Sequence, residues 1–376
     1  MMIKKNSQTL QDSTALEHRI KLETHWNKAR IFVIVQMVIM LIQKQTVNLT
    51  AIAKGLNPAV STVTNYRRLQ KFFLEFMPGP DGFARLLASF LPEGSWTLSM
   101  DRTNWQFGEK NINILMLAVV YQGIAIPLLW SLLPKKGNSN VDERIALLER
   151  FIALFGRERI KMLLADREFV GILWVDWLCN KKVPFVIRFR NDLRLLEQRK
   201  EKRGTPALEL LRGLPLKEAY CLGRHFAYGR KLDISGMRIS GRDSHVIVMS
   251  YGVDPEEAIP NYARRWEIET LFGCFKTRGF NLEDTHMSDP EKISKLTGIL
   301  SIAFAWAYRV GEWLDELRPI KIKQHGRKAV SLFRYGLDYL DELLLNRHYP
   351  GNQAKLEWAL QVLIHPGDPP GLRNGR

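Results

Sequence analysis

The sequence predicts a mixed α/β fold flanked by helices at both ends. Strand-forming runs and helical stretches alternate between residues 96 and 189, short strands divided by glycines follow up to residue 251, and helical periodicity governs both ends of the chain. The chain has 376 residues, of which 46% are hydrophobic. This length allows about two or three domains, and the composition excludes a mainly disordered or low-complexity protein.

The N-terminal segment, residues 1–88, is predicted to form a helical domain. Residues 1–25 are polar and are expected to be loosely ordered, whereas the apolar stretch Ala29–Gln43 predicts a core helix. Beyond it, Asn48 is placed to cap a short helix and Ser61 to cap a longer one. The pair has the outline of a helix-turn-helix.

The second helix of this pair is predicted to have a basic outer face. Apolar residues recur at helical spacing and are expected to face inward, namely Val63, Tyr66, Leu69, Phe73 and Phe76. The residues left outside, where such helices meet a DNA groove and its phosphates, are Thr64, Asn65, Arg67, Arg68 and Lys71. An ordinary helical hairpin with a solvated basic face explains the same pattern equally well.

Residues 89–190 follow the breaker cluster Met77–Gly82 and show a different pattern. The predicted elements are, in order, a strand Trp96–Met100, two strands on either side of a turn at Tyr121–Gly123, a helix Val141–Phe155, a strand Ile160–Ala165, a helix Gly171–Asn180 and a strand Pro184–Phe189. Three strands followed by helix, strand, helix and strand is the order expected of a ribonuclease-H-like mixed sheet with helices on its faces.

One stretch, Asn111–Pro134, contains no charged residue and is long enough to cross a membrane. The Tyr121–Gly123 turn interrupts it, so two buried neighbouring strands are favoured over a membrane helix. The N-terminus lacks the apolar core of a secretory signal, and the three cysteines form no C-x-x-C motif. The protein is therefore expected in the reducing cytoplasm, without a membrane partner.

Residues 191–250 are predicted to form a β-rich insertion that opens with a charged segment. Its strands, divided at Gly229-Arg230 and Gly241–Asp243, suggest a small antiparallel sheet, with Tyr220–Tyr228, Leu232–Ser240 and His245–Tyr251. The second part of the core, 251–318, and the C-terminal region, 319–376, are predicted to be helical. The C-terminal region ends in a frayed tail from His365, and dimerisation is one role open to it.

Two aspartates stand where predicted strands end: Asp101 and Asp166 each follow an apolar run. A carboxylate at such a point is costly to bury unpaired, so it binds a metal, meets a cation or caps a turn. A single strand-end aspartate often caps a helix, but two on adjacent strands favour a catalytic pair. The nearby Glu168 and Asp176 are given no role.

A third acidic residue lies in the segment Asn261–Lys276, which is interpreted as one helix. Four of its polar residues would point into one arc of about 60°, namely Tyr262, Arg265, Glu269 and Lys276. An apolar stripe beside them would press the helix onto the sheet, with Ile268, Leu271, Phe272 and Phe275. Glu269 is thereby expected beside the two aspartates.

Three carboxylates next to cationic side chains suit phosphodiester cleavage or transfer. Two hard divalent cations, held by three carboxylates and a phosphate, can activate the attacking oxygen and stabilise the leaving oxygen. Asp101, Asp166 and Glu269 would be the metal ligands. The contacts to phosphate and to the DNA end would come from Tyr262, Arg265 and Lys276. The formal net charge of +16 also fits a polyanionic partner, with nucleic acid ahead of an anionic membrane surface.

The motifs resemble those of a known family. The Y-x-x-R-x-x-x-E-x-x-x-x-x-x-K pattern from Tyr262 to Lys276, with D-R-T-N-W at Asp101 and A-D-R-E-F at Asp166, closely resembles bacterial DDE transposases of the insertion-sequence-4 family. The resemblance spans roughly residues 45–310. As in the family, the long interval between the second aspartate and the glutamate holds a β-rich insertion.

This resemblance implies a homodimer that binds the terminal inverted repeats of a mobile element in double-stranded DNA. It implies two Mg²⁺ ions, for which Mn²⁺ can substitute, with 3′-end cleavage and strand transfer into target DNA. Some relatives pass through a hairpin intermediate, in which an aromatic residue of the inserted sheet, commonly Trp, stacks on a flipped base.

The sequence departs from the family at this aromatic residue. None of its ten tryptophans lies between Trp177 and Trp266, so Phe226 or Tyr228 is the expected substitute. Trp105 and Trp266 lie inside the motifs as core or DNA-facing residues, and core is the preferred interpretation. Two other functions remain open: a metal-dependent nuclease that cuts without joining, and a DNA-binding regulator with a non-catalytic core.

Overall fold

The structure is a computed structural model that describes residues 14–79, 81–190, 192–197, 204–240, 245–324 and 326–365. It divides into two compact units. Unit 1 comprises residues 1–93, 105–110 and 272–376, and unit 2 comprises residues 94–104 and 111–271. The segments 1–88 and 319–376, which the sequence assigned to separate domains, are thus both in unit 1. Some sequence predictions lie partly or wholly outside the described residues, namely residues 1–13 of the segment expected to be loosely ordered, part of the charged segment, the turn at Gly241–Asp243 and the tail after His365.

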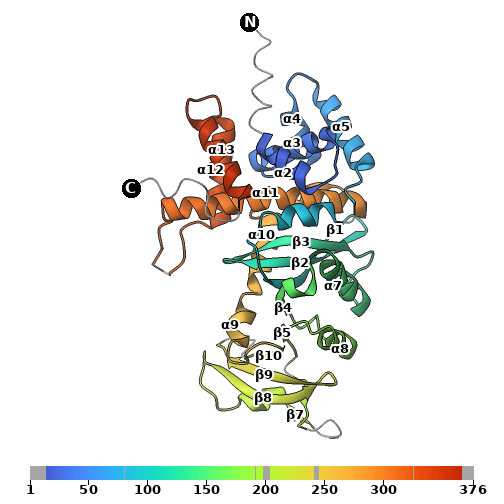
Figure 1. The fold of residues 1–376 in the computed structure, drawn as a ribbon, viewed down its shortest axis with the longest axis vertical. Coiled ribbons are helices and arrows are strands. Elements are labelled where there is room, and N and C mark those ends of the chain that lie inside the picture. Colours follow the sequence, from blue (N-terminus) through green and yellow to red (C-terminus); the bar gives the residue numbers. More distant parts are fainter. Residues whose placement is uncertain are drawn as a thin grey trace. The chain divides into compact units, whose positions relative to one another are not determined.

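Unit 2 is built on an eight-stranded sheet with the order β3-β2-β1-β4-β5-β10-β9-β8 (Figure 1). Its strands are β1 (Trp96–Phe107), β2 (Lys110–Tyr121), β3 (Ile124–Leu132), β4 (Ile160–Ala165), β5 (Phe185–Arg188), β8 (Ala219–Ala227), β9 (Arg230–Arg238) and β10 (His245–Tyr251). β4 pairs parallel with β1 and β5, whereas β2 and β3 pair antiparallel. The predicted mixed α/β fold with a large mixed sheet is confirmed and is consistent with a ribonuclease-H-like core.

The inserted strands continue this sheet instead of forming a separate one, which corrects the sequence prediction. β10 pairs antiparallel with β5, and β9 and β8 follow. The pairing covers the edge of β5, which would otherwise expose unpaired backbone groups. A further two-stranded sheet joins β6 (Arg194–Leu195) to β7 (Thr205–Pro206), followed by the 3₁₀ helix Ala207–Leu211.

Helices cover both faces of the unit 2 sheet. In Figure 1, α7 (Val141–Phe155) and α8 (Ile172–Asn180) lie on one side and α9 (Ala258–Ala263) on the other. The 3₁₀ turn Arg157–Arg159 leads from α7 into β4. α7 begins in a capping box, in which Asn140 and Glu143 each accept a hydrogen bond from the other's backbone N–H.

Two predicted boundaries differ from the structure. β1 does not end at Asp101 but continues to Phe107, because Thr103 and Trp105 extend the alternation of buried and exposed side chains. The segment predicted as one helix is broken into α9 and α10 (Trp266–Phe275). Between them the N–H groups of Arg264 and Arg265 bond three residues back, which tightens the chain into a turn.

The uncharged stretch 111–134 forms β2 and β3, as predicted. Gln122 and Gly123 both have positive φ, which suits a tight hairpin turn. In the part of the chain that the structure describes, no single helix is long and apolar enough to cross a membrane. A bent pair, α3 (Lys28–Lys44) and α4 (Leu49–Leu56), would pass by length and composition only, with 109° between its helices.

Unit 1 is helical. Besides α3 and α4, its helices are α2 (Thr14–Glu23), α5 (Thr62–Glu75), α6 (Gly82–Ala88), α11 (Pro290–Leu317), α12 (Leu332–Leu345) and α13 (Asn352–Ile364), with a 3₁₀ turn at Leu282–Thr285. α2 departs from the loose order predicted for residues 1–25, because Leu16 and Ile20 are buried. The apolar stretch Leu296–Ala307 is buried within α11.

α11 packs against α3, α5, α6, α12 and α13. Its approach to α12 depends on two glycines. A Cβ on Gly311 would lie 1.8 Å from the Leu332 carbonyl oxygen, and one on Gly336 would lie 1.9 Å from that of Ala307. No larger side chain fits this crossing without moving the backbones apart.

α4 and α5 form the predicted helix pair, and both predicted caps are present. Asn48 accepts from Thr50 and Ala51, and Ser61 accepts from Thr64. On the α5 face predicted to contact DNA, Asn65 departs from expectation: it is 2% exposed, and its Nδ2 donates to the carbonyl oxygens of Ala53 and Asn57 at 3.1 and 2.9 Å. Val63, expected inside, is exposed. The rest of the predicted face is exposed, namely Thr64, Arg67, Arg68 and Lys71.

Candidate active site

Three neighbouring strands of unit 2 bring polar side chains into one row. In the β1–β4 register Met100 lies opposite Ala165, so the next residue on each chain is Asp101 and Asp166. In the β4–β5 register Ala165 lies opposite Ile187, and the next residue is Arg188. Since these strands are parallel, the three side chains follow one another across the sheet.

The guanidinium of Arg265 joins two of the predicted carboxylates. Its Nη1 donates to Asp101 Oδ2 at 3.3 Å, and its Nη2 donates to Glu269 Oε1 at 2.7 Å. Its Nε donates to the Tyr262 hydroxyl at 3.2 Å, and that hydroxyl donates to Asp166 Oδ1 at 3.1 Å. These five side chains form one network around the Arg265 guanidinium, and Arg265 itself is only 3% exposed.

Each aspartate is also oriented by its own backbone. Asp101 Oδ1 accepts from the Arg102 N–H at 2.7 Å, and Asp166 Oδ1 accepts from the Arg167 N–H at 2.7 Å. Asp166 opens a turn that the Phe169 N–H closes on the Asp166 carbonyl oxygen at 2.9 Å. The position of each carboxylate therefore depends on the residues that directly follow it.

Burial raises the pKa of Asp101 from 3.8 to about 6. The Arg102 N–H and the Arg265 guanidinium oppose this rise, while the charges of Asp166 and Glu168 add to it. For Asp101, the stabilisation of the carboxylate by these two groups is smaller than the effect of burial. A further cation beside Asp101 would favour its ionised form.

The two proton donors of the network, Tyr262 and Arg265, keep their protons at neutral pH. Burial raises the pKa of Tyr262 to about 12, so its hydroxyl is a hydrogen-bond donor. Burial by itself lowers the pKa of Arg265, but Tyr262, Glu269 and the two aspartates outweigh burial and raise it above its usual range. Arg265 therefore remains a cation.

Three further residues were predicted to belong to the site. Lys276 follows α10 in unit 1, where its Nζ pairs with Glu283 at 2.8 Å and lies 5.9 Å from the Trp105 ring centroid. Phe226 and Tyr228 lie at the end of β8, which β9 and β10 separate from β5, and both are partly buried.

The two motif tryptophans differ in exposure. Trp105 is 7% exposed, as the core interpretation predicts. Trp266 is 62% exposed, so the core interpretation is wrong for this residue. Its ring centroid lies 5.5 Å from the Arg265 Cζ, within cation–π range. An exposed aromatic ring therefore lies beside the carboxylate network.

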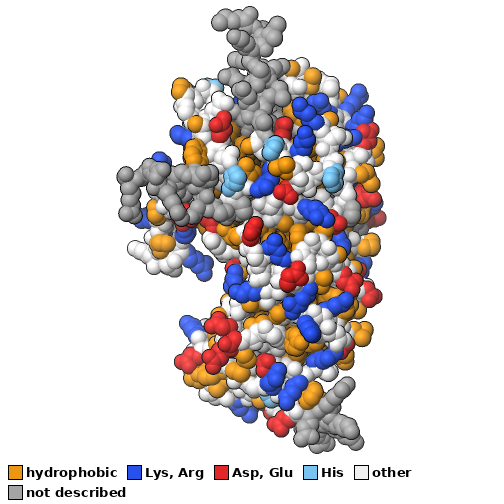
Figure 2. Space-filling model, viewed as in Figure 1, with side chains coloured by type: hydrophobic (Ala, Val, Ile, Leu, Met, Phe, Trp, Pro, Cys, Tyr) orange, Lys and Arg blue, Asp and Glu red, His pale blue; other side chains and the backbone are white. Residues whose placement is uncertain are grey.

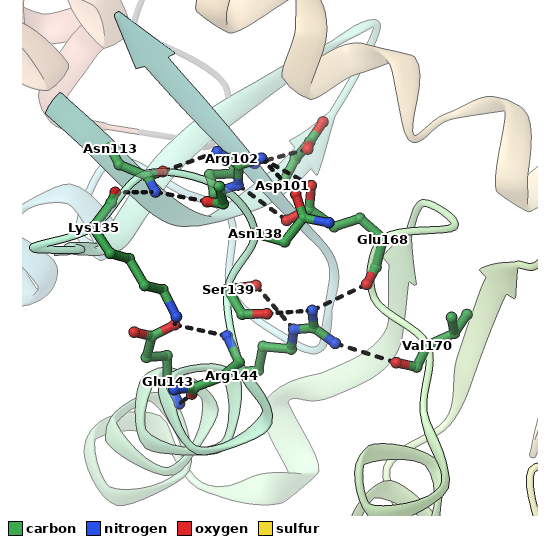
Figure 3. Close-up of polar contacts among 12 residues, drawn as sticks. Asp101, Arg102, Asn113, Lys135, Asn138, Ser139, Glu143, Arg144, Glu168 and Val170 are labelled. Atoms are coloured by element: carbon green, nitrogen blue, oxygen red, sulfur yellow. Dashed lines mark hydrogen bonds and ion pairs between the residues drawn. The ribbon is translucent and has the colours of Figure 1, made fainter. Parts of the chain in front are cut away.

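Two features of the site were not predicted from the sequence. Arg188 shares the row with the aspartates, and its position at the end of a strand beside that of Asp166 was the signal that could have found it. Glu168 and Arg102 form an ion pair behind the aspartates (Figure 3). No local pattern links these two residues, because Arg102 lies within β1 and Glu168 lies in the turn after β4.

Among the residues that the structure describes, no group of three or more His, Cys, Asp or Glu side chains is arranged to hold a metal ion. Asp101 and Glu269 each direct an oxygen at the Arg265 guanidinium instead. The donor chemistry still fits, since three carboxylates are hard ligands of the kind that Mg²⁺ and Mn²⁺ prefer. The raised pKa of Asp101 also fits a metal site, because a bound cation would stabilise its ionised form.

Comparison with known proteins gives one family. The family model described as "Transposase DDE domain" matches residues 92–306. This range covers more than half of the chain and contains Asp101, Asp166 and Glu269. A search of curated protein sequences gave no significant match.

Proposed function

Because the chain belongs to the transposase DDE domain family, we propose that it cuts and joins DNA ends with Asp101, Asp166 and Glu269 as metal ligands. The observation that carries this proposal is the β1–β4 register, which sets the two aspartates side by side, with Glu269 joined to Asp101 through Arg265. The Tyr262-to-Lys276 pattern supports assignment to the insertion-sequence-4 family.

Two divalent cations, Mg²⁺ or Mn²⁺, would supply Lewis acidity at the attacking and leaving oxygens when bound. Asp101 and Asp166 would hold them from the sheet. For Glu269 to take part, it must exchange its bond with Arg265 for the cation. DNA binding provides the alternative partner that Arg265 then needs, since a guanidinium binds a phosphate through its bidentate fork.

The other polar residues would act on the phosphate. The protonated Tyr262 can donate a hydrogen bond to a phosphate oxygen, and it cannot serve as a general base at neutral pH. Arg188 adds positive charge beside Asp166 in the same row. Lys276 is proposed as a further contact to the DNA end.

The exposed aromatic ring of Trp266 is a better candidate than Phe226 or Tyr228 for stacking on a flipped base. It adjoins Arg265, whereas the other two residues lie at the end of β8. A flipped base is held by stacking on aromatic side chains, and an exposed ring beside a proposed phosphate-binding arginine suits that role. A hairpin intermediate therefore belongs to the proposal, with Trp266 as the stacking residue.

The helix pair α4 and α5 would bind the terminal inverted repeats. Figure 2 shows Lys and Arg side chains gathered over these helices. The exposed Thr64, Arg67, Arg68 and Lys71 are the proposed contacts, and the buried Asn65 is removed from that set. Lys71 has only a long ion pair of 3.7 Å with Glu75, which a phosphate could replace. Homodimer formation on DNA remains part of the proposal.

The test is a reaction in vitro with Mg²⁺, a duplex carrying the inverted-repeat end found beside the gene, and a supercoiled target plasmid. Wild-type protein should give joined products, and Glu269→Gln should give none. Glu149→Gln, an exposed carboxylate in the same unit, is the matched control and should join like wild type. Cleavage without joining would instead support a nuclease, and binding without either reaction would support a regulator.

A further inference from the structure

We propose that Glu168 and Arg102 form a positioning pair that sets the separation of Asp101 and Asp166. The inference rests on the proposed function and deepens it, because it names residues that act through the metal ligands and not on the substrate. Neither residue belongs to the carboxylate set assigned above.

The contact between the two side chains is bidentate. Arg102 Nε donates to Glu168 Oε1 at 3.1 Å, and Arg102 Nη2 donates to Glu168 Oε2 at 3.2 Å. The side chains are only 12% and 21% exposed. A two-point contact between planar groups fixes direction as well as distance, which a single ion pair does not.

The pair connects the chain next to one aspartate with the chain next to the other. Arg102 directly follows Asp101, and Glu168 lies inside the turn that Asp166 opens and Phe169 closes. Each aspartate already accepts a hydrogen bond from the N–H of the residue that follows it. Holding Arg102 against Glu168 therefore holds the two carboxylate-bearing segments in one arrangement.

Both ends of the pair are themselves held (Figure 3). Arg102 also donates to the side-chain oxygens of Asn113 and Asn138, at 3.1 Å each. Asn113 in turn donates to two carbonyl oxygens of the loop after β3, those of Lys135 and Gly137. The guanidinium thus has partners on all three of its nitrogens and little freedom to rotate.

The turn that carries Glu168 is held separately by Arg144 of α7. Its Nη2 donates to the Glu168 carbonyl oxygen at 3.0 Å, and its Nη1 donates weakly to that of Val170 at 3.4 Å. Its Cζ lies 5.0 Å from the ring centroid of the buried Phe169. The turn after Asp166 is therefore fixed at two places: Arg144 binds its backbone and Arg102 binds its Glu168 side chain.

Glu168 acts through the geometry of its contact with Arg102 and not through its charge near Asp101. Its negative charge raises the pKa of Asp101, and that charge is paired with the Arg102 guanidinium through two hydrogen bonds. A Mg²⁺ site demands near-ideal ligand geometry, and partners behind the ligands supply it. Loss of such a partner typically weakens metal affinity or activity by about 10–100-fold.

The experiment compares wild type with Glu168→Gln, which removes the charge at nearly constant shape, and with Arg102→Lys, which keeps the charge but loses the fork. Mn²⁺ binding is measured by electron paramagnetic resonance on the full-length protein without DNA. Each variant should bind Mn²⁺ about 10–100-fold more weakly. The double variant should bind Mn²⁺ no more weakly than the single variant with the lower affinity, because the two residues act as one unit.

Two controls separate positioning from folding. Asp176→Asn breaks the ion pair with Arg230 elsewhere in unit 2 and should leave Mn²⁺ affinity unchanged. Asp166→Asn removes a proposed ligand and should abolish tight binding. Affinity for the DNA end should stay within about twofold of wild type in every pair variant, since the pair faces the metal ligands. If Glu168→Gln melts far below wild type, Arg102→Lys carries the test.

The outcomes distinguish this inference from the proposed function. One outcome would overturn the positioning role alone: wild type cuts and joins DNA, but Glu168→Gln and Arg102→Lys bind Mn²⁺ as tightly as wild type does. Wild type that cuts no DNA, with Mn²⁺ binding indifferent to Asp166→Asn, would overturn the proposed function and this inference with it. A selective loss of Mn²⁺ affinity in both pair variants supports the pair.

Discussion

Arg265 contacts Asp101 and Glu269 with one guanidinium, and the proposed reaction requires the same group to reach a phosphate. The side chain of Arg265 is 4% exposed and that of Glu269 is 39% exposed. The bond to Glu269 is therefore the one that solvent and an incoming cation can reach. At the scale of single residues, the Arg265 cation links two of the three proposed metal ligands.

Arg265→Gln should destabilise the metal-free protein by about 3 kcal/mol, because it leaves the buried Asp101 carboxylate without its cationic partner. It should also bind divalent metal more tightly than wild type, because no guanidinium competes for the carboxylates. Thermal unfolding with EDTA and with Mg²⁺ measures both effects. Arg264→Gln, at the neighbouring and more exposed arginine, is the control. A smaller Mg²⁺-induced rise in melting temperature for Arg265→Gln than for wild type would contradict this view of the site.

The raised pKa of Asp101 predicts a pH dependence of stability in metal-free buffer. Its folded-state pKa of about 6 lies above the ordinary 3.8, so the folded protein binds this proton more tightly than the unfolded chain. The resulting contribution to the free energy of unfolding is present below about pH 4 and is lost as the pH rises through about 6.

Asp101→Asn cannot ionise and should escape that loss. At about pH 8 it should be more stable than wild type by up to about 3 kcal/mol, and the difference should shrink towards about pH 4.5. Urea unfolding with EDTA at both pH values measures it, with Asp176→Asn as a surface control. Equal stability of Asp101→Asn and wild type at the higher pH would show that burial of the ionised Asp101 carboxylate does not destabilise the protein.

At the scale of elements, α5 shows how one helix divides its residues between structure and surface. Asn65 satisfies two carbonyl oxygens at the end of α4, and buried Lys295 of α11 donates to the Phe73 carbonyl oxygen at 2.9 Å. These contacts fix the orientation of the helix within unit 1. The same orientation leaves Arg67 and Arg68 exposed.

Arg67→Ala and Arg68→Ala should weaken binding to the DNA end while leaving the melting temperature unchanged. Each lost phosphate contact should make the slope of log K against log salt shallower by about one. Fluorescence anisotropy over a salt series measures this slope. Lys355→Ala, an exposed lysine on α13, should bind like wild type. An unchanged slope in both arginine variants would remove α5 from the DNA interface.

At the scale of the whole molecule, the chain returns twice to the unit in which it began. Unit 1 collects segments from both ends of the chain together with residues 105–110, and unit 2 collects most of the large sheet and the β-rich insertion. The net charge of +16 belongs to the chain as a whole. It favours a polyanionic partner but does not select the surface that binds it.

Features that depend on near neighbours were predictable from the amino-acid order. α7 and β4 have the predicted bounds, and the caps at Asn48 and Ser61 are confirmed. The aspartate pair was also accessible, because an apolar run followed by a carboxylate is a local pattern. Such features are set by hydrogen bonds and periodicity within a few residues.

Partners that lie far apart in the sequence could not be predicted, because strand register and helix packing decide them. Arg188 joins the aspartates only through the β4–β5 register, and Glu168 in the turn after β4 meets Arg102 of β1. Asn65 is polar and yet buried, since the carbonyl oxygens that need it belong to another helix. Residue types and their spacing thus indicated the chemistry of the site. Long-range packing decided which acidic and basic side chains form ion pairs. The physical reason is that burial and electrostatic partners exist only once distant segments are in contact.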